Sequence, residues 1–253
     1  MPELVVALDF QAPAEALDMA RCLQSVTGPG QPKLWMKVGL ELFVAGGPDI
    51  VRSLKHMGFR VFLDLKFLDI PNTVRGAVRS AVKSGADMLN IHAIGGLEMA
   101  RTAVAARDGA ADELGLSEKP LLLAVTVLTS MQDTDTPILR GREAGDVALD
   151  LAKLARQAGL DGVVCSGREV ASIKAECGAE FVCLTPGIRL PDPLSEADDQ
   201  RRVMTPEAAV AAGSDFLVVG RPITRALEGK GGPVALAREM LGRMASASAA
   251  GKV

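Results

Sequence analysis

The sequence predicts an α/β fold: a single (β/α)₈ TIM barrel with eight parallel strands. Eight short apolar runs recur along the chain, and the segments between them place apolar residues at helical spacing. The chain has 253 residues. Eight strand–helix units would then have about 32 residues each, and about 250 residues is the ordinary length of one such barrel. We therefore expect residues 1–253 to form one domain, with a flexible C-terminal tail from about residue 246.

The expected strands are nearly continuous in apolar character, which is typical of parallel strands covered on both faces. They span residues 4–10, 34–40, 61–67, 87–93, 121–128, 162–166, 181–187 and 216–220. An open, doubly wound sheet is the alternative. That fold usually has a glycine-rich turn after its first strand, whereas the segment DFQAPAE at 9–15 contains no glycine. The barrel is therefore favoured.

The helices expected between the strands have recognisable faces and ends. Val74, Val78, Ala81 and Val82 follow the spacing of one helix face. Thr205, followed by Pro, is typical of a helix start. Glycine past the last turn can adopt the left-handed conformation that ends a helix, which predicts stops at Gly58, Gly85, Gly159, Gly178 and Gly213.

The composition excludes several kinds of partner. The chain carries 28 Lys and Arg against 31 Asp and Glu, a formal net charge of −3, without a block of basic residues. A nucleic-acid partner is therefore not expected, because binding to the phosphate backbone depends on clustered cations. No apolar run has the length of a membrane span, and the first residues lack the charged start of a secretory signal. We expect a cytoplasmic protein that does not bind membranes.

Charged residues interrupt or follow the predicted strands near their carboxyl ends, where barrels of this kind carry their active sites. Asp64 and Lys66, in the third strand, are two residues apart and so share one face. Burying both charges is costly unless they are paired, and Lys37 on the second strand would extend the pair into a row of alternating charge. Further candidates near the strand ends are Asp9, Asp69, Thr129, Gly220 and Arg221.

This row has a structural and a functional interpretation. A purely structural ion pair is the simpler one. The functional one is favoured, because charges from three strands converge on the catalytic face of the barrel. Neighbouring carboxylates would keep Lys66 protonated and available as a general acid. His92, which ends the fourth strand, is not assigned a direct catalytic role, because nothing around it forms a triad or a metal-binding spacing.

The segment after the seventh strand predicts a loop that binds an anion. It is long, polar and rich in Pro and Asp, and loops of this length in compact domains are usually functional or disordered. Barrels often bind phosphate between their seventh and eighth loops. The candidates for this role are Arg189, Gln200, Arg201, Arg202, Gly220 and Arg221.

The segment Asp64–Thr73, DLKFLDIPNT, resembles the signature of the orotidine 5′-phosphate decarboxylase family. Six further segments match in the family's order and extend the resemblance over nearly the whole chain, which makes it highly specific. They are Leu8-Asp9, Met36–Gly39, Val127–Met131, Thr185–Arg189, Asp199–Arg202 and Val219–Pro222.

This resemblance implies decarboxylation of orotidine 5′-phosphate to uridine 5′-phosphate and carbon dioxide in pyrimidine biosynthesis, without a cofactor or metal, by a homodimer with shared active sites. Lys66 would protonate the ring carbon that loses carbon dioxide. Asp64 would lie against the substrate carboxylate, with Lys37 and Asp69 completing the row. The implied binding residues are Asp69, Ile70 and Thr73 for the partner's site, Asp9 and Lys37 for the ribose, Thr129 for the pyrimidine, Pro186 for the pocket wall, and Arg189, Gln200, Gly220 and Arg221 for the phosphate.

Other functions remain open on the sequence. A related barrel, a Mg²⁺-dependent sugar-phosphate decarboxylase or aldolase, shares the D-x-K-x-x-D strand but places an acid on the second strand, where Lys37 would repel a cation. A Schiff-base aldolase is disfavoured, because residues 162–166 contain no lysine. A non-catalytic barrel that binds a phosphorylated ligand is the third alternative, and the complete set Lys37, Asp64 and Lys66 disfavours it.

Overall fold

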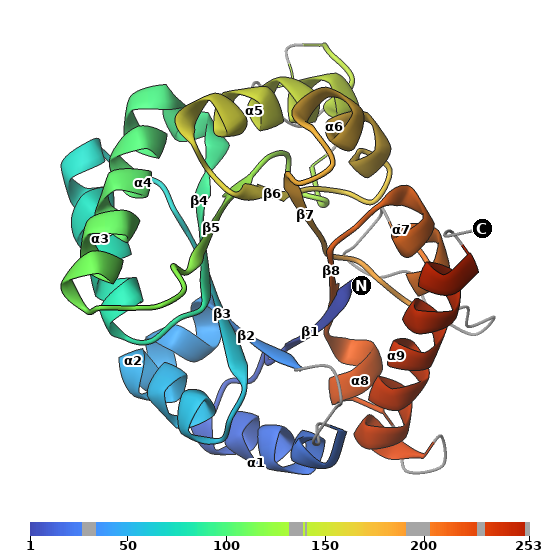
Figure 1. Cartoon of the computed structure of the whole chain (residues 1–253). Helices are drawn as coiled ribbons and strands as arrows, with labels where there is room; N and C mark the ends of the chain where they lie inside the picture. Colours follow the sequence, from blue (N-terminus) through green and yellow to red (C-terminus); the bar gives the residue numbers. More distant parts are fainter. Residues whose placement is uncertain (27–33, 132–138, 140, 191–202, 227–230, 251–253) are drawn as a thin grey trace.

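The eight strands of the chain close into one all-parallel barrel. A computed structural model describes residues 1–26, 34–131, 139, 141–190, 203–226 and 231–250. Its strands pair in chain order, and the eighth is hydrogen-bonded to the first. Helices surround the barrel (Figure 1). The predicted (β/α)₈ TIM barrel is therefore confirmed.

All eight predicted strands are present, and most of them end before the apolar run does, where the chain turns into the loops at the mouth of the barrel. The strands are β1 (Glu3–Ala7), β2 (Trp35–Gly39), β3 (Arg60–Phe67), β4 (Met88–His92), β5 (Leu121–Val125), β6 (Gly162–Val164), β7 (Val182–Thr185) and β8 (Phe216–Val219). The α-helices are α1 (Pro13–Leu23), α2 (Leu40–His56), α3 (Pro71–Lys83), α4 (Gly96–Glu113), α5 (Ala144–Ala158), α6 (Val170–Cys177), α7 (Pro206–Ala212), α8 (Arg221–Thr224) and α9 (Gly232–Ala250).

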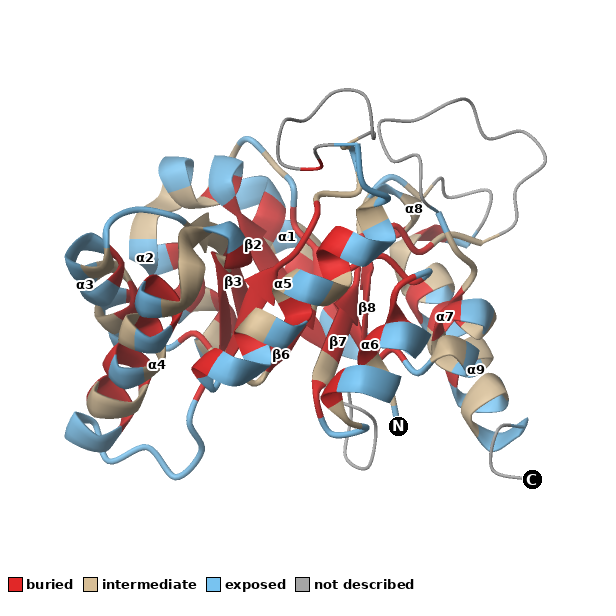
Figure 2. Cartoon of the chain, turned by 90° about the horizontal axis from the view of Figure 1, so that it is seen from above, coloured by how far each residue is buried: buried red, intermediate tan, exposed pale blue. Residues whose placement is uncertain are grey.

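The helices pack their apolar faces on the barrel and expose the opposite faces (Figure 2). The buried residues of α3 are the predicted Val74, Val78, Ala81 and Val82. The five glycines expected to end helices all have positive φ, the backbone region that favours glycine. Thr205 caps the first turn of α7, where its hydroxyl accepts a backbone N–H.

Helix α9 differs from the expectation at its C-terminal end. It continues to Ala250, so residues 246–250, which were expected to begin a flexible tail, are helical. The physical reason is the run of Ala and Ser at 245–250, because Ala has the highest helix propensity of all residues. Among the described residues, no helix combines the length and the apolar character needed to cross a membrane.

Large side chains fill the interior of the barrel. Trp35 is 1% exposed, donates its Nε1 hydrogen to Glu3 at 2.8 Å and meets Phe216 edge to face at 5.3 Å between ring centroids. Phe62 and Met88 belong to the same cluster. Because this core is packed, we expect the ligand to bind at the carboxyl ends of the strands rather than inside the barrel.

Three aspartates tie the amino ends of the strands together, a feature that was not predicted from the sequence. Each stands directly before an even-numbered strand, two residues after a glycine. One carboxylate oxygen of each accepts the backbone N–H of the second residue of the neighbouring odd-numbered strand at 2.7 Å. Each carboxylate also pairs with a cation of a flanking helix. The pairs are Asp87 with Lys55, Asp161 with Arg107, and Asp215 with Lys174.

Replacing Asp161 with alanine is expected to destabilise the chain by about 2–3 kcal/mol, somewhat less than the loss of a fully buried ion pair. The Arg107 side chain is 7% exposed and would keep only Asp108 as its carboxylate partner, and the backbone N–H of Leu122 would lose its acceptor. Urea unfolding followed by circular dichroism measures this change.

The matched control is Asp150→Ala, which breaks an exposed pair with Arg142 and should cost about 1 kcal/mol or less. Equal losses of unfolding free energy in the two variants would contradict the structural role of Asp161.

Candidate active site

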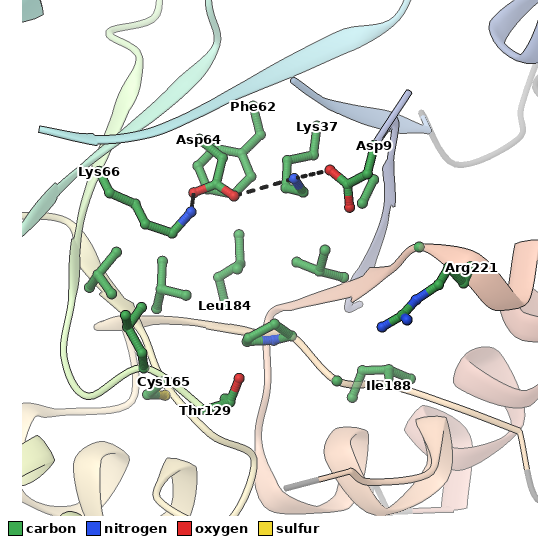
Figure 3. A pocket seen from close by; sticks show the side chains of 18 of the residues that line it. Asp9, Lys37, Phe62, Asp64, Lys66, Thr129, Cys165, Leu184, Ile188 and Arg221 are labelled. Atoms are coloured by element: carbon green, nitrogen blue, oxygen red, sulfur yellow. Dashed lines mark hydrogen bonds and ion pairs between the residues drawn. The ribbon is translucent and has the colours of Figure 1, made fainter. Parts of the chain in front are cut away.

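Four charged side chains form a row of alternating sign at the carboxyl ends of β1, β2 and β3. The Lys37 ammonium donates a hydrogen bond to Asp9 Oδ1 at 2.9 Å and lies 3.3 Å from Asp64 Oδ2. Lys66 Nζ lies 2.6 Å from Asp64 Oδ1. Figure 3 shows the four side chains in the order Asp9, Lys37, Asp64, Lys66 along one wall of a pocket. Four of the strand-end charges singled out in the sequence therefore lie together.

The centre of the row is withdrawn from water, since Lys37 and Asp64 are each 8% exposed. Burial alone lowers the pKa of Lys37, but the charges of Asp64 and Asp9 outweigh it and raise the pKa above its ordinary value. Burial alone raises the pKa of Asp64, but the charges of Lys37 and Lys66 outweigh it and lower the pKa below its ordinary value. Both groups are therefore charged at neutral pH.

A bulge in β3 places Lys66. The pairing of β3 with β4 is irregular between Leu63 and Phe67, where residues 64–66 stand opposite the single residue Asn90. Lys66 has a φ of 52°, and in the part of the chain that the structure describes it is the only residue other than glycine with positive φ. Such backbone is unfavourable for a residue with a side chain, and strain of this kind clusters at functional sites.

A pocket of about 230 Å³ opens beside the row. Its walls combine the charged side chains of the row with apolar ones, among them Phe62 and Leu184 (Figure 3). Most of the residues predicted to bind or transform a substrate meet around this space. They are Asp9, Lys37, Asp64, Lys66, Thr129, Pro186, Arg189, Gly220 and Arg221.

The two ends of the pocket differ in chemistry. Figure 3 shows Arg221 near the Asp9 end of the row, with Lys66 at the opposite end. Arg189 also lines the pocket, where its backbone N–H donates to the carbonyl of Met204 at 3.0 Å. The pocket therefore offers the guanidinium of Arg221 at one end, well separated from the ammonium of Lys66 at the other.

Three predicted residues do not line the pocket of their own chain. Asp69, Ile70 and Thr73 are exposed, in the loop between β3 and α3 and in the first turn of α3. Asp69 Oδ1 accepts the backbone N–H of Ile70 at 2.7 Å. Within one chain, Asp9 rather than Asp69 provides the second carboxylate of the row. The predicted residues Gln200, Arg201 and Arg202 lie outside the described residues.

Two residues that place the charged row were not predicted from the sequence. The Asn90 side chain, on β4, donates to Asp64 Oδ1 at 2.8 Å and accepts the backbone N–H of Lys66 at 2.8 Å. Gly39 leaves room for the ammonium of Lys37, since a Cβ at this position would lie 3.0 Å from Lys37 Nζ. A signal for Asn90 was present, because an amide that interrupts an apolar strand is as unusual as the carboxylate of Asp64.

His92 ends β4 but does not line the pocket. Its Nδ1 is buried and has no hydrogen-bond partner. Among the buried side-chain nitrogen and oxygen atoms of the described residues, it is the only one without a partner. Burial lowers the pKa of His92, and the charge of Lys66 lowers it further against the opposing effect of Asp64. The ring is therefore neutral at neutral pH. In the described segments, no three or more His, Cys, Asp or Glu side chains gather as a metal site would require.

The fold and the site together define a class of protein: a (β/α)₈ barrel enzyme with an acid–base row at the carboxyl ends of its strands. A comparison with family models shows which member of this class is present. The chain belongs to the orotidine 5′-phosphate decarboxylase / HUMPS family, whose model matches residues 2–238.

Curated relatives match along the same length. An orotidine 5′-phosphate decarboxylase of Maridesulfovibrio salexigens is 54% identical over 246 residues, which are 97% of this chain and 100% of that protein. One of Nitratidesulfovibrio vulgaris is 57% identical over 246 residues, 97% of this chain and 99% of that protein. The prediction of an enzyme of this family is therefore confirmed.

Solved structures agree with this membership. An orotidine 5′-phosphate decarboxylase from Lactobacillus acidophilus has a TM-score of 0.78 and 34% identity, and the match covers 96% of this chain and 99% of that one. An uncharacterized conserved protein from Geobacillus kaustophilus has a TM-score of 0.79 and 35% identity over 95% of this chain and 99% of that one.

Proposed function

We propose that this chain decarboxylates orotidine 5′-phosphate to uridine 5′-phosphate and carbon dioxide, in pyrimidine biosynthesis and without a cofactor. The observation that carries the proposal is the row Asp9–Lys37–Asp64–Lys66, which ends in an ammonium at the pocket. Family membership and the names of relatives that match almost the whole chain support the choice of substrate.

Lys66 is the proton donor in this proposal. Loss of carbon dioxide leaves an electron pair on the pyrimidine carbon that carried the carboxylate. An ammonium held in place stabilises this negative charge as it develops, and then donates its proton to the carbon. The Lys66 side chain is 28% exposed and faces the pocket, whereas the side chain of Asp64, taken without its backbone, is 12% exposed. Both side chains line the pocket, and Lys66 is the more accessible of the two.

Asp64 lies against the substrate carboxylate in the proposed complex. Its lowered pKa keeps it ionised, and two carboxylates brought together in a buried site repel each other. Departure of carbon dioxide removes one of the two charges and so relieves the repulsion. Lys37 balances Asp64 throughout, because it contacts both Asp64 and Asp9.

The remaining pocket residues bind the rest of the nucleotide. Asp9 and Lys37 hold the ribose hydroxyls, Thr129 binds the pyrimidine and Pro186 forms part of the wall. The phosphate binds at the guanidinium end, and the proposed contacts are Arg189, Gln200, Gly220 and Arg221. Binding energy from a phosphate remote from the reacting carbon can be used to stabilise the transition state.

We further propose that the chain forms a homodimer with shared active sites, in which Asp69, Ile70 and Thr73 contact the partner's substrate. Leu68, Ile70 and Ile94 are large apolar side chains that are 42% or more exposed beside the mouth of the barrel. Exposed apolar groups that gather on one face mark interaction sites. A phosphorylated, water-soluble substrate favours a cytoplasmic location, with residues 1–253 acting as one catalytic domain.

An ultraviolet assay of orotidine 5′-phosphate consumption in excess EDTA tests this function. We expect turnover that is unchanged when Mg²⁺ replaces EDTA, because the ammonium of Lys37 occupies the space between the Asp9 and Asp64 carboxylates and repels a divalent cation. Protein with Lys66→Ala, purified in parallel, is the control for contaminating activity. Absence of turnover, or turnover only with Mg²⁺, would show that the proposal is wrong.

A further inference from the structure

We propose that Asn90 is a positioning residue for the proton donor: its side-chain amide holds Lys66 in the bulge of β3 and fixes the Asp64 carboxylate beside it. This inference rests on the proposed function, in which Lys66 donates a proton to the substrate. Asn90 is 0% exposed and does not line the pocket. It therefore acts through Lys66 and Asp64 rather than by touching the substrate.

The first contact replaces strand pairing that the bulge removes. Residues 64–66 of β3 face only Asn90 of β4, so the backbone of β4 does not offer one residue to each of them. In a regular parallel pair, strand N–H groups donate to backbone carbonyls. Here the N–H of Lys66 donates to Asn90 Oδ1 at 2.8 Å instead. The side chain thus satisfies a polar group that the irregular pairing would leave without an acceptor.

The second contact fixes the carboxylate. Asn90 Nδ2 donates to Asp64 Oδ1 at 2.8 Å, and the same oxygen receives the ammonium of Lys66 at 2.6 Å. Asn90, Asp64 and Lys66 therefore form a closed ring of hydrogen bonds. The orientation of the amide follows from its partners, because a backbone N–H only donates and an ionised carboxylate only accepts.

No other common side chain of this size meets both demands. Asp has the acceptor but, when ionised, no donor for Asp64, and Leu has neither. Gln is one methylene longer in a fully buried position. The acceptor provided by Asn90 matters because Lys66 has a positive φ, which is unfavourable for a residue with a side chain. Without the bond to Asn90, the backbone is expected to relax and to displace Lys66 Nζ, and a displacement of about 1 Å can reduce a catalytic rate by about 10²-fold.

The test is steady-state kinetics of Asn90→Ala, with the dissociation constant for uridine 5′-phosphate measured in parallel. We expect kcat to fall by about 10²-fold. KM and the dissociation constant should stay within about threefold, because the residues that contact the ligand are unchanged. The matched control is Ser214→Ala, which removes a buried side-chain hydrogen bond to Thr185 where neither partner lines the pocket. Its kcat should stay within about twofold of the original.

A second variant gives a readout that a purely structural role would not change. Asn90→Asp preserves the side-chain shape and the acceptor for Lys66, but its ionised form repels Asp64. When protonated, the new carboxyl group can donate to Asp64 Oδ1 and accept from Lys66, as the amide does. The kcat of Asn90→Asp relative to the unsubstituted enzyme should therefore rise as the pH falls. If Asn90→Ala does not fold, this pH dependence alone tests the positioning role of Asn90.

The outcomes separate two failures. If the unsubstituted chain turns over orotidine 5′-phosphate and Asn90→Ala has a kcat within threefold of it, the role of Asn90 is wrong and the proposed function stands. A relative kcat of Asn90→Asp that does not vary with pH would also overturn the role of Asn90. If the unsubstituted chain shows no turnover, the proposed function fails and this inference fails with it.

Discussion

Replacing Lys66 with alanine is expected to reduce kcat by about 10⁴-fold or more, because the variant loses both the proton donor and the positive charge that stabilises the carbanion. Binding of uridine 5′-phosphate should change by less than about tenfold. The product has no carboxylate to place at this end of the pocket, and Asp64 keeps Lys37 at 3.3 Å and the amide of Asn90 at 2.8 Å as partners. The loss should therefore appear in kcat rather than in binding.

Stopped assays of product formation and calorimetric titration with uridine 5′-phosphate measure the two effects. Lys55→Ala is the matched control, since Lys55 pairs with Asp87 at 2.6 Å at the amino ends of the strands, far from the pocket. That variant should lose stability but retain kcat within about twofold. Turnover of Lys66→Ala close to that of the unsubstituted enzyme would show that Lys66 is not the proton donor.

The barrel was predictable because its signals are local. Each strand reads as a short apolar run, and each helix has its own spacing and end signals, as α3 and the glycines that follow several helices show. The C-terminal segment was the exception. Its run of Ala and Ser at 245–250 fits either a frayed end or a helix, and the helix propensity of Ala, which favours the helix, is too weak a signal to decide between the two from the sequence.

The charged row was predictable for a related reason. A parallel barrel brings the carboxyl ends of all its strands to one face, so Asp9, Lys37, Asp64 and Lys66 had to meet there once their strands were identified. The bulge that places Lys66 was not predictable, because it arises from the register between β3 and β4. Register depends on two strands at once. Asp64 and Lys66 both line the pocket, so their predicted common face holds although the strand is irregular.

Contacts between distant segments also explain the other unpredicted features. Asn90 is an isolated amide in the sequence, and only the pairing of β4 with β3 shows that it contacts Lys66 and Asp64. The structural role of the Asp161 carboxylate likewise depends on its ion pair with Arg107, which is 54 residues away in the sequence. Sequence patterns give the faces of single elements, whereas these hydrogen bonds depend on which elements become neighbours.

Mixing subunits with Lys66→Ala and subunits with Asp69→Ala is expected to restore activity from nearly none to about a quarter of the original, if active sites are shared between subunits. In a two-fold dimer, each site takes Lys66 from one subunit and Asp69 from the other. One site of the mixed dimer then carries both substitutions and the other carries neither. Random mixing gives about half mixed dimers with one intact site each.

The measurement is the specific activity of the mixture and, after isolation of the dimers that carry both of two different affinity tags, that of the mixed dimers alone, which should reach about half of the original because one of their two sites is intact. The control pairs Lys66→Ala with a subunit that carries both substitutions, since no combination of these two restores a complete site. Absence of recovery in verified mixed dimers would mean that Asp69 acts within its own chain or not at all. The single chain favours recovery, because Asp69 is exposed and outside the pocket, whereas every member of the row Asp9–Lys37–Asp64–Lys66 lines it. A residue so placed can contribute to decarboxylation only through a second copy or through a rearrangement of the loop between β3 and α3, and the mixed dimer separates these two cases.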